Sequence, residues 1–176
     1  MDLYWTGSTR RAKEKSLAVT KTKTITRLKA QGRKNPRIEV YLDGELWAIL
    51  DAETTVREGL GRGQDLDEAR CAAIELTDAT VRARKAAAGH AAHSPKTRNQ
   101  LELFLRQRKY PEKAIERALD ILSETGTVND EEAATRMVRM RRRKADMGPR
   151  RLEAELMARG VDASLARQKE AEAVEV

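Results

Sequence analysis

Apolar residues follow a strand-like pattern in the first part of the chain and a helical period after it. The segments TITRLKA, RIEVYL and ELWAIL are rich in β-branched and aromatic residues, and Ile38, Val40 and Leu42 alternate with charged or aromatic neighbours. Asp43-Gly44 separates the last two segments, and this dipeptide is favoured in two-residue type I′ hairpin turns. We therefore expect a small β-hairpin or three-stranded sheet whose apolar face packs on the segment that follows.

After Asp65 the apolar residues recur three and four positions apart, as they do in amphipathic helices. Asp65 with Glu68 predicts the start of the first long helix, and Ser94-Pro95 predicts the start of the next. Gly126 follows an apolar run as a helix-ending glycine, and Asn129 is placed to cap a new helix. The expected apolar positions of the first long helix are Ala69, Ala72, Ala73, Leu76 and Val81.

The helical part contains an internal repeat. The segments NQLELFLRQRKY and RRLEAELMARGV align at an offset of 51 residues, and in each copy a turn and a second helix follow. Stacked units of short helices bury a core that no single unit can bury, so the fold class is mainly α, with tandem three-helix repeats forming an elongated solenoid. The aligned pairs are Leu101 with Leu152, Glu102 with Glu153, Leu105 with Leu156, and Arg108 with Arg159.

The chain divides into three expected segments. Residues 1–23 are polar and basic without sustained periodicity, so we expect a flexible basic arm, which is suited to contact DNA. Residues 24–64 form the small β-rich N-terminal module, and residues 65–176 form the tandem three-helix repeats, of which the last is expected to be incomplete.

The composition of the chain limits the classes of partner that it is expected to bind. The 176 residues carry a formal net charge of +7 at pH 7, which favours a polyanion such as nucleic acid. A lone cysteine, Cys71, excludes an intramolecular disulfide, and no secretion signal is recognised at the N-terminus, so we expect a cytoplasmic protein. No segment approaches the roughly 20 apolar residues that cross a bilayer, so no membrane contact is expected.

A basic cluster lies in the second repeat. Between Arg136 and Arg151 there are eight basic residues against one acidic residue, a local charge of +7. Gly148-Pro149 opens a helix within this cluster, and guanidinium groups beside helix N–H groups suit phosphates or a carboxylate-rich protein surface. The alternative is that the cluster is only a solvated helix face. The candidate filament- and DNA-binding residues are Arg136, Arg139, Arg142, Arg143, Lys144, Arg150 and Arg151.

No residue set indicates catalysis. His90 and His93 are three residues apart, but no nearby cysteine or carboxylate set completes a metal site with the usual ligand spacing. Cys71 lies among alanines and is expected to be a small core residue. Aromatic residues make up 3% of the chain, so electrostatic contact with nucleic acid is favoured over base stacking. We therefore expect neither an enzyme nor a bound metal or cofactor.

The order of these motifs resembles the RecX family of regulators. A leucine-rich helix leads to a turn with the bulky Tyr110, then a second helix and Gly126 follow, and the basic stretch RMRRRKADMGPRRL comes after them. The YLDGE turn and the DAETTVREGLGRGQDL segment are also similar to longer members of the family, so the resemblance covers residues 24–165. The chain departs from the family at Ala133, where members often carry a bulky residue, and we expect the family's third repeat to be missing.

The resemblance implies a monomeric, non-enzymatic regulator of DNA repair and recombination, including the SOS response. Such a regulator lies in the helical groove of a RecA-type recombinase filament, blocks subunit addition and slows ATP turnover and strand exchange. Contact with single- or double-stranded DNA is expected to be electrostatic. The alternatives are a stand-alone basic nucleic-acid-binding helical module and an adaptor whose solenoid binds another protein.

Overall fold

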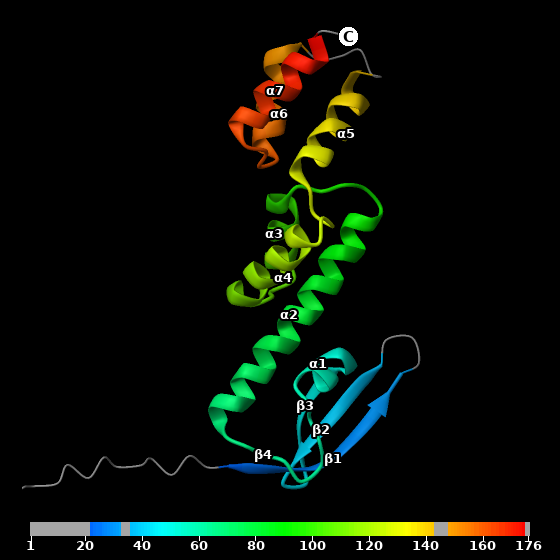
Figure 1. The fold of residues 1–176 in the computed structure, drawn as a ribbon, viewed down its shortest axis with the longest axis vertical. Coiled ribbons are helices and arrows are strands. Elements are labelled where there is room, and N and C mark those ends of the chain that lie inside the picture. The colour runs from blue at the N-terminus through cyan, green and yellow to red at the C-terminus, as the bar shows by residue number, and fades with distance from the viewer. Residues whose placement is uncertain (1–21, 33–35, 143–147, 175–176) are drawn as a thin grey trace, which may run out of the picture.

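The computed structural model describes residues 22–32, 36–142 and 148–174 of the chain. A small antiparallel sheet forms one end of an elongated molecule, and helices follow one another towards the opposite end (Figure 1). The expected mainly helical fold with an N-terminal sheet is confirmed.

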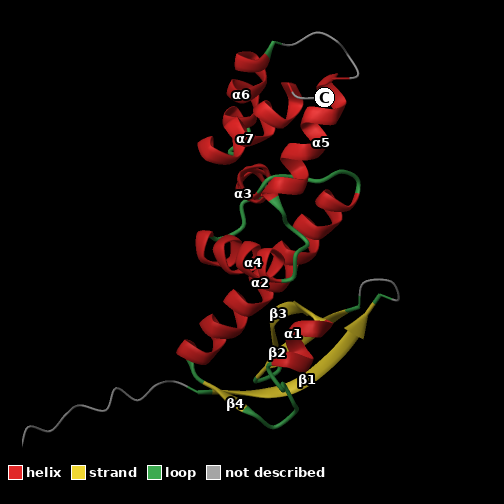
Figure 2. Ribbon diagram, turned by 45° about the horizontal axis from the view of Figure 1, so that its top comes forward, coloured by secondary structure: helices red, strands yellow, loops and turns green. Residues whose placement is uncertain are grey.

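The sheet has four strands in the order β3-β2-β1-β4 (Figure 2). Asp43 and Gly44 join β2 to β3 with positive φ angles of 51° and 90°, as a type I′ turn requires, so the predicted hairpin is confirmed. The fourth strand was not expected from the sequence, because two residues are too few to show a periodicity. The strands are β1 (Lys23–Gln31), β2 (Arg37–Leu42), β3 (Glu45–Asp51) and β4 (Asp65–Leu66).

One face of this sheet packs on two helices, α1 (Ala52–Arg57) and the 25-residue α2 (Glu68–Ala92). Ile74 of α2 is fully buried in the same core as Ile25 and Val40 of the sheet. The core residues of this module are Ile25, Val40, Leu42, Leu50, Leu60, Leu66 and Ile74.

A buried carboxylate joins α2 to the sheet. Asp78 Oδ1 accepts hydrogen bonds from the backbone N–H of Asp51, at 2.6 Å, and from the Thr54 hydroxyl, at 3.1 Å. Asp51 in turn caps α1 by accepting from Glu53 N–H at 2.9 Å. Asp51 thus forms the N-cap of α1 through its side chain and a hydrogen bond to Asp78 of α2 through its backbone N–H. The capping of α1 and its attachment to α2 therefore depend on the same residue.

The predicted apolar face of α2 is confirmed only in part. Val81 is buried as predicted and Leu76 is half-buried, but Ala69, Ala72 and Ala73 are exposed. Ile74 and the polar Asp78, which were not predicted, are buried. The first turns of α2 meet the sheet only along a narrow strip, so alanines outside that strip face solvent. The helix also begins later than predicted, with Asp67 as N-cap, because Asp65 belongs to β4.

The C-terminal half of α2 packs with two further helices and forms the first three-helix unit. The second helix of this unit begins after Thr97, not at Ser94-Pro95, because Thr97 and Gln100 form a reciprocal capping box. The predicted cap Asn129 is confirmed, since its side chain accepts from the N–H groups of Glu131 and Glu132. The helices of the two units are α2, α3 (Arg98–Gln107) and α4 (Glu112–Glu124), then α5 (Asp130–Arg142), α6 (Pro149–Ala158) and α7 (Ala163–Val174).

The predicted repeat is confirmed in side-chain burial and in the backbone. Leu101 and Leu105 are buried in the first unit, and Leu152 and Leu156 in the second. The turn after each helix is also repeated, because Tyr110 N–H donates to the Leu105 carbonyl at 3.3 Å, and Val161 N–H donates to the Leu156 carbonyl at 3.1 Å. The next-to-last residue of each turn has a positive φ, 59° at Lys109 and 81° at Gly160.

Candidate nucleic-acid interface

Helix α5 presents two of the predicted arginines to solvent. Its buried residues Ala133, Ala134 and Val138 fix the face that packs on the rest of the protein, so Arg136 and Arg139 lie on the exposed side. The helix starts with Asn129 as its cap and with acidic residues in its first turn, both of which favour the N-terminal end of a helix. Arg139 therefore lies in the last turn of α5, where the helix dipole favours positive charge, and Arg136 lies at the middle of the helix.

Helix α6 presents two more arginines at its first turn. Gly148 is the N-cap with an extended backbone and no side-chain cap hydrogen bond, and Pro149 takes the first helical position, as predicted. Arg150 and Arg151 are exposed, while Leu152 is buried and holds this end of the helix in the core. Helix N–H groups and two guanidinium groups thus lie at the same end of α6, an arrangement that suits anionic groups.

These four arginines have no ionic partner among the described residues, whereas several other arginines of the chain are paired. Arg98 binds Asp120 at 2.7 Å, and many other arginines of the chain are similarly paired with a carboxylate. Within residues 22–32, 36–142 and 148–174 no salt bridge involves Arg136, Arg139, Arg150 or Arg151. Their charges are therefore free to interact with a polyanion, and we name these four residues the arginine surface.

Part of the predicted site is not described. The side chain of Arg142, and the whole of Arg143 and Lys144, lie outside the described residues, as does the predicted basic arm up to residue 21. Their roles stay predictions from the sequence.

Comparison of the two units shows that the fold does not require three of the four charges of the arginine surface. At the offset of 51 residues, Arg139, Arg150 and Arg151 correspond to Ala88, Asn99 and Gln100 of the first unit. The counterpart of Arg136 is the basic Lys85, which is bound to Asp51 at 2.7 Å. The first unit thus packs with neutral residues at three of these positions, and the corresponding charges of the second unit are additions to a common scaffold.

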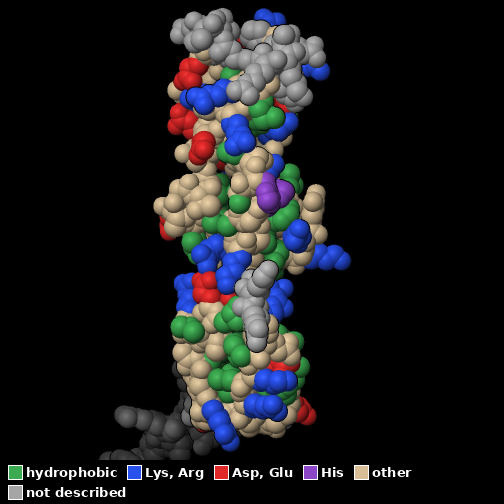
Figure 3. All heavy atoms as spheres, turned by 90° about the vertical axis from the view of Figure 1, so that its right-hand side faces the viewer, with side chains coloured by type: hydrophobic (Ala, Val, Ile, Leu, Met, Phe, Trp, Pro, Cys, Tyr) green, Lys and Arg blue, Asp and Glu red, His purple; other side chains and the backbone are tan. Residues whose placement is uncertain are grey.

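A second basic concavity, which was not predicted from the sequence, lies at the turn between α3 and α4. It has a volume of about 500 Å³, and Arg82, Arg108, Lys109 and Tyr110 contribute to its lining. Arg82 contacts Asp78 at 3.5 Å and lies 6.0 Å from the centre of the Tyr110 ring, while Arg108 lies 4.4 Å from that of Phe104. Arg82 and Arg108 are thus held by neighbours. Figure 3 shows lysine and arginine side chains along the whole length of one side of the molecule.

The histidine pair is not arranged as a metal site. The His90 ring stacks on Phe104 with centroids 4.1 Å apart, and its pKa is lowered by burial, with Lys96 and Arg108 adding to the effect. His93 is the exposed C-cap of α2. Throughout the described part of the chain, no group of three His, Cys, Asp or Glu residues could hold a metal ion.

Cys71 is half-buried against the core of the N-terminal module. Burial raises the pKa of its thiol, and the nearby Glu75 and Asp67 carboxylates raise it further. This environment disfavours the thiolate and thus a reactive cysteine.

Of the helices formed by the described residues, none combines the length and apolar character needed to span a membrane.

Comparisons with known proteins find similarity to RecX regulatory proteins. A profile of the second three-helix domain of RecX matches residues 129–169, which contain the arginine surface. A regulatory protein RecX of Clostridium botulinum is 28% identical over 137 residues, covering 78% of this chain and 64% of that protein. A regulatory protein RecX of Bacillus pumilus is 27% identical over 138 residues, covering 78% of this chain and 52% of that protein.

A solved structure shares the fold. The crystal structure of a regulatory protein RecX superimposes with a TM-score of 0.72 at 24% sequence identity, over 85% of this chain and 73% of that chain. This chain spans between about half and two thirds of the length of the curated relatives described above.

Proposed function

The chain belongs to the RecX family, and from this premise we propose that it is a regulatory protein of a RecA-type recombinase. It binds the recombinase–DNA filament in the cytoplasm and inhibits filament extension, ATP hydrolysis and strand exchange. The observation that carries this proposal is the arginine surface, four exposed arginines without a carboxylate partner among the described residues.

The position of these arginines supports a docking role. They lie on α5 and α6 of the second unit, on the side away from the buried residues Ala134, Val138 and Leu152. A surface that no other part of the described chain neutralises is suited to bind phosphates of DNA or carboxylates of the recombinase. Because the molecule is elongated (Figure 1), it offers a long contact surface to a helical groove.

The inhibition needs no bond-making chemistry. A bound chain occupies the place of an incoming recombinase subunit and holds its neighbours against the rearrangements that accompany ATP turnover. Binding through phosphates releases condensed counterions, so the affinity falls as salt concentration rises. The extent of inhibition then depends on the fraction of filament sites that the chain occupies, and this fraction is set by the binding affinity and the salt concentration.

The test is a titration of a purified RecA-type recombinase on single-stranded DNA with the full chain. We expect the rate of ATP hydrolysis and the yield of strand exchange to fall as the chain is added. No effect at several-fold excess over filament ends would contradict the proposal.

A charge-matched pair of variants tests the arginine surface itself. Replacing its four arginines by glutamine should raise the concentration needed for half-maximal inhibition at least tenfold. The control removes four exposed positive charges elsewhere that also have no carboxylate partner among the described residues, and it should inhibit like the wild type; its positions are Arg27, Arg37, Arg62 and Lys113. Equal loss in both variants would mean that net charge alone, not this surface, determines inhibition.

The same arginines also suit bare DNA, so a stand-alone nucleic-acid-binding module is the second candidate. Such a module binds duplex or single-stranded DNA tightly without recombinase. Tight binding to bare DNA together with an unchanged recombinase ATPase would favour this second candidate over the first.

A further inference from the structure

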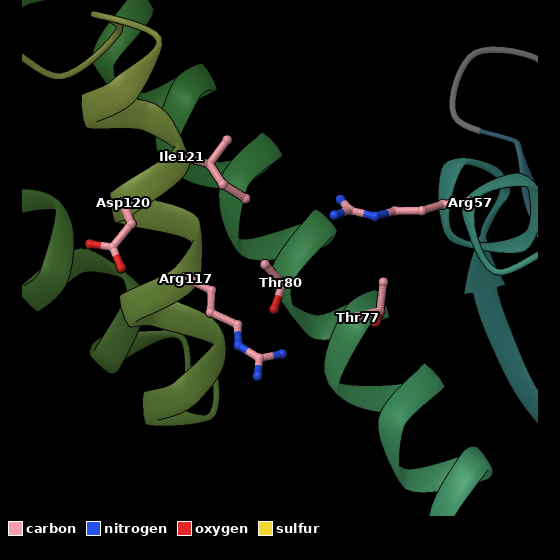
Figure 4. Close-up of a pocket in the computed structure, with 6 residues that line it drawn as sticks. All are labelled: Arg57, Thr77, Thr80, Arg117, Asp120 and Ile121. Carbon is pink, nitrogen blue, oxygen red and sulfur yellow. The ribbon is translucent and has the colours of Figure 1, made fainter.

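A polar cleft lies where the N-terminal module meets the first three-helix unit. It has a volume of about 360 Å³, within the range of ligand-binding pockets, and α1, α2 and α4 supply its walls (Figure 4). Arg57 of α1 and Arg117 of α4 extend towards α2 from opposite sides, and Thr77 and Thr80 of α2 lie between them. The lining residues are Arg57, Thr77, Thr80, Arg117, Asp120 and Ile121.

The cleft carries a net positive charge. Neither Arg57 nor Arg117 forms a salt bridge with any described residue. Asp120 is the one acidic side chain of the lining, and Arg98 neutralises it with a 2.7 Å ion pair. Arg98 is held in place because its guanidinium also donates to the Ser123 hydroxyl at 3.2 Å. Two uncompensated guanidinium groups therefore face one another across the cleft.

The two threonines contribute differently. The Thr80 hydroxyl donates to the Leu76 carbonyl at 2.8 Å, so its proton is already used within α2. The Thr77 hydroxyl is half-buried and forms no hydrogen bond with the residues that the structure describes. Thr77 can thus donate to a bound group between the two arginines.

We propose that this cleft binds a phosphate group between Arg57 and Arg117, with the Thr77 hydroxyl as an additional donor. The tetrahedral oxygens of a phosphate accept from two guanidinium forks on opposite sides and from a hydroxyl at once, whereas the two oxygens of a carboxylate lie in one plane. The net charge of the cleft also matches a phosphate monoester or a phosphodiester.

This phosphate site lies between α1, α2 and α4, whereas the arginine surface lies on α5 and α6. A phosphodiester of a nucleic-acid backbone and the phosphate of a small metabolite share the recognised group. The site requires no recombinase, so it can be tested on the isolated chain, independently of the proposed function.

The experiment follows backbone amide signals of the full chain by NMR during titration with inorganic phosphate, at an ionic strength held constant with chloride. We expect saturable shifts at Thr77, Thr80 and Ile121. In the variant Arg57→Gln/Arg117→Gln the affinity should fall at least tenfold, and in Arg57→Lys/Arg117→Lys it should fall less, because charge is kept while the fork geometry is lost.

The control is Arg37→Gln/Arg62→Gln, which removes two exposed arginines outside the cleft and should bind phosphate like the wild type. The unperturbed signals of each variant report whether it is folded. Shifts that do not saturate, shifts spread over all basic surfaces, or unchanged affinity in a folded Arg57→Gln/Arg117→Gln variant would overturn the phosphate site.

A second titration, with a short duplex oligonucleotide, identifies the source of the phosphate. Shifts at the same three residues would assign the cleft to a nucleic-acid backbone. Saturable shifts with inorganic phosphate alone would assign it to a small phosphate compound. Either result supports a phosphate site.

Discussion

The side-chain hydroxyl of Thr97 donates a 2.6 Å hydrogen bond to the main-chain carbonyl of Arg159, 62 residues further along the chain. Thr97 is fully buried and caps α3 of the first unit, while Arg159 is the C-cap of α6 of the second unit. The same side chain therefore satisfies the start of one helix and the end of another, and it joins the two units.

Replacement of Thr97 by valine keeps the shape of the side chain and removes both hydrogen bonds. We expect the free energy of unfolding, measured by urea denaturation, to fall by about 1–3 kcal/mol, because a helix cap is lost and a carbonyl loses its partner. The control Thr127→Val changes an exposed threonine near the other connection between the units and should cost less than about 0.5 kcal/mol. Equal costs would show that the Thr97 contact contributes nothing to stability.

Gly160 is expected to tolerate no side chain, for two reasons. Its φ of 81° is strained for other residues, and an added Cβ would collide with the side chain of Asn99 in the first unit. We expect Gly160→Ala to lower the free energy of unfolding by about 2–4 kcal/mol, the sum of backbone strain and overpacking.

Gly126→Ala is the matched comparison for this substitution. Gly126 has a similar φ of 70°, but a Cβ there would meet no atom within 4 Å, so only the backbone term of about 1 kcal/mol is expected. If the two alanine variants lose the same stability in urea denaturation, the close approach of the two units at Asn99 does not constrain Gly160.

Acid should weaken the attachment of α2 to the N-terminal module through Asp51. Burial acts to raise the pKa of Asp51, but the hydrogen bond from the Lys85 ammonium at 2.7 Å and the one from Glu53 N–H outweigh it, so the pKa is lowered. A lowered carboxyl pKa contributes stability above the ordinary value, and this contribution is lost as the pH falls through the folded-state pKa. Stability should therefore decline below about pH 4.

The measurement is the free energy of unfolding against pH for the wild type, Asp51→Asn and Lys85→Met. Both variants should be less stable at neutral pH and should show a shallower decline in acid, because each removes the ion pair that lowers the pKa of Asp51. An acid decline as steep in both variants as in the wild type would assign the pH dependence to other carboxylates.

The salt dependence of DNA binding should distinguish phosphate contacts made by the arginine surface from a nonspecific effect of the net positive charge. For binding to duplex DNA, each phosphate contact contributes about 0.9 to the slope of the logarithm of affinity against that of salt concentration. Replacing the four arginines by glutamine should reduce the slope by about 0.9 for each one that contacts a phosphate. Fluorescence anisotropy at several salt concentrations measures this slope. The control at Arg27, Arg37, Arg62 and Lys113 should keep the wild-type slope.

The sequence predicts the repeated core well, because periodic leucines report burial directly. Leu101, Leu105, Leu152 and Leu156 are inward-facing as the internal alignment implies. Caps that act on neighbouring N–H groups are also predictable, as at Asn129. At the start of α3 two local signals compete, and the capping box of Thr97 and Gln100 sets the first residue in place of Ser94-Pro95. The hydrogen bond from Thr97 to the distant Arg159 carbonyl leaves no mark in the local sequence.

Buried charge is the other feature that the sequence hides. Lys169 is buried even though its ammonium group is charged, because Glu131 and Glu172 bind it at 3.1 and 3.0 Å. At the offset of 51 residues its counterpart in the first unit is the buried Ala118. From the pattern of apolar and polar residues in the sequence alone, such a lysine would be expected to face solvent.

The same limit applies to the candidate sites. A dense run of arginines is visible in the sequence, but which arginines are free of carboxylates depends on residues that folding brings near. The cleft between Arg57 and Arg117 joins residues 60 positions apart in the chain, and neither lies in a basic cluster. A site of this kind has no local signature.

Helix α2 belongs to two cores at once, because Ile74 packs with the sheet and Ala83 and Ala87 pack with the first three-helix unit. At 1.5 Å per residue its 25 residues measure about 37 Å, so it acts as a stiff lever between the two. A rotation of the sheet must therefore rotate the first unit with it. A rotation of the second unit against the first has to break the hydrogen bonds from Thr97 to the Arg159 carbonyl and from the Arg98 N–H to Asp130.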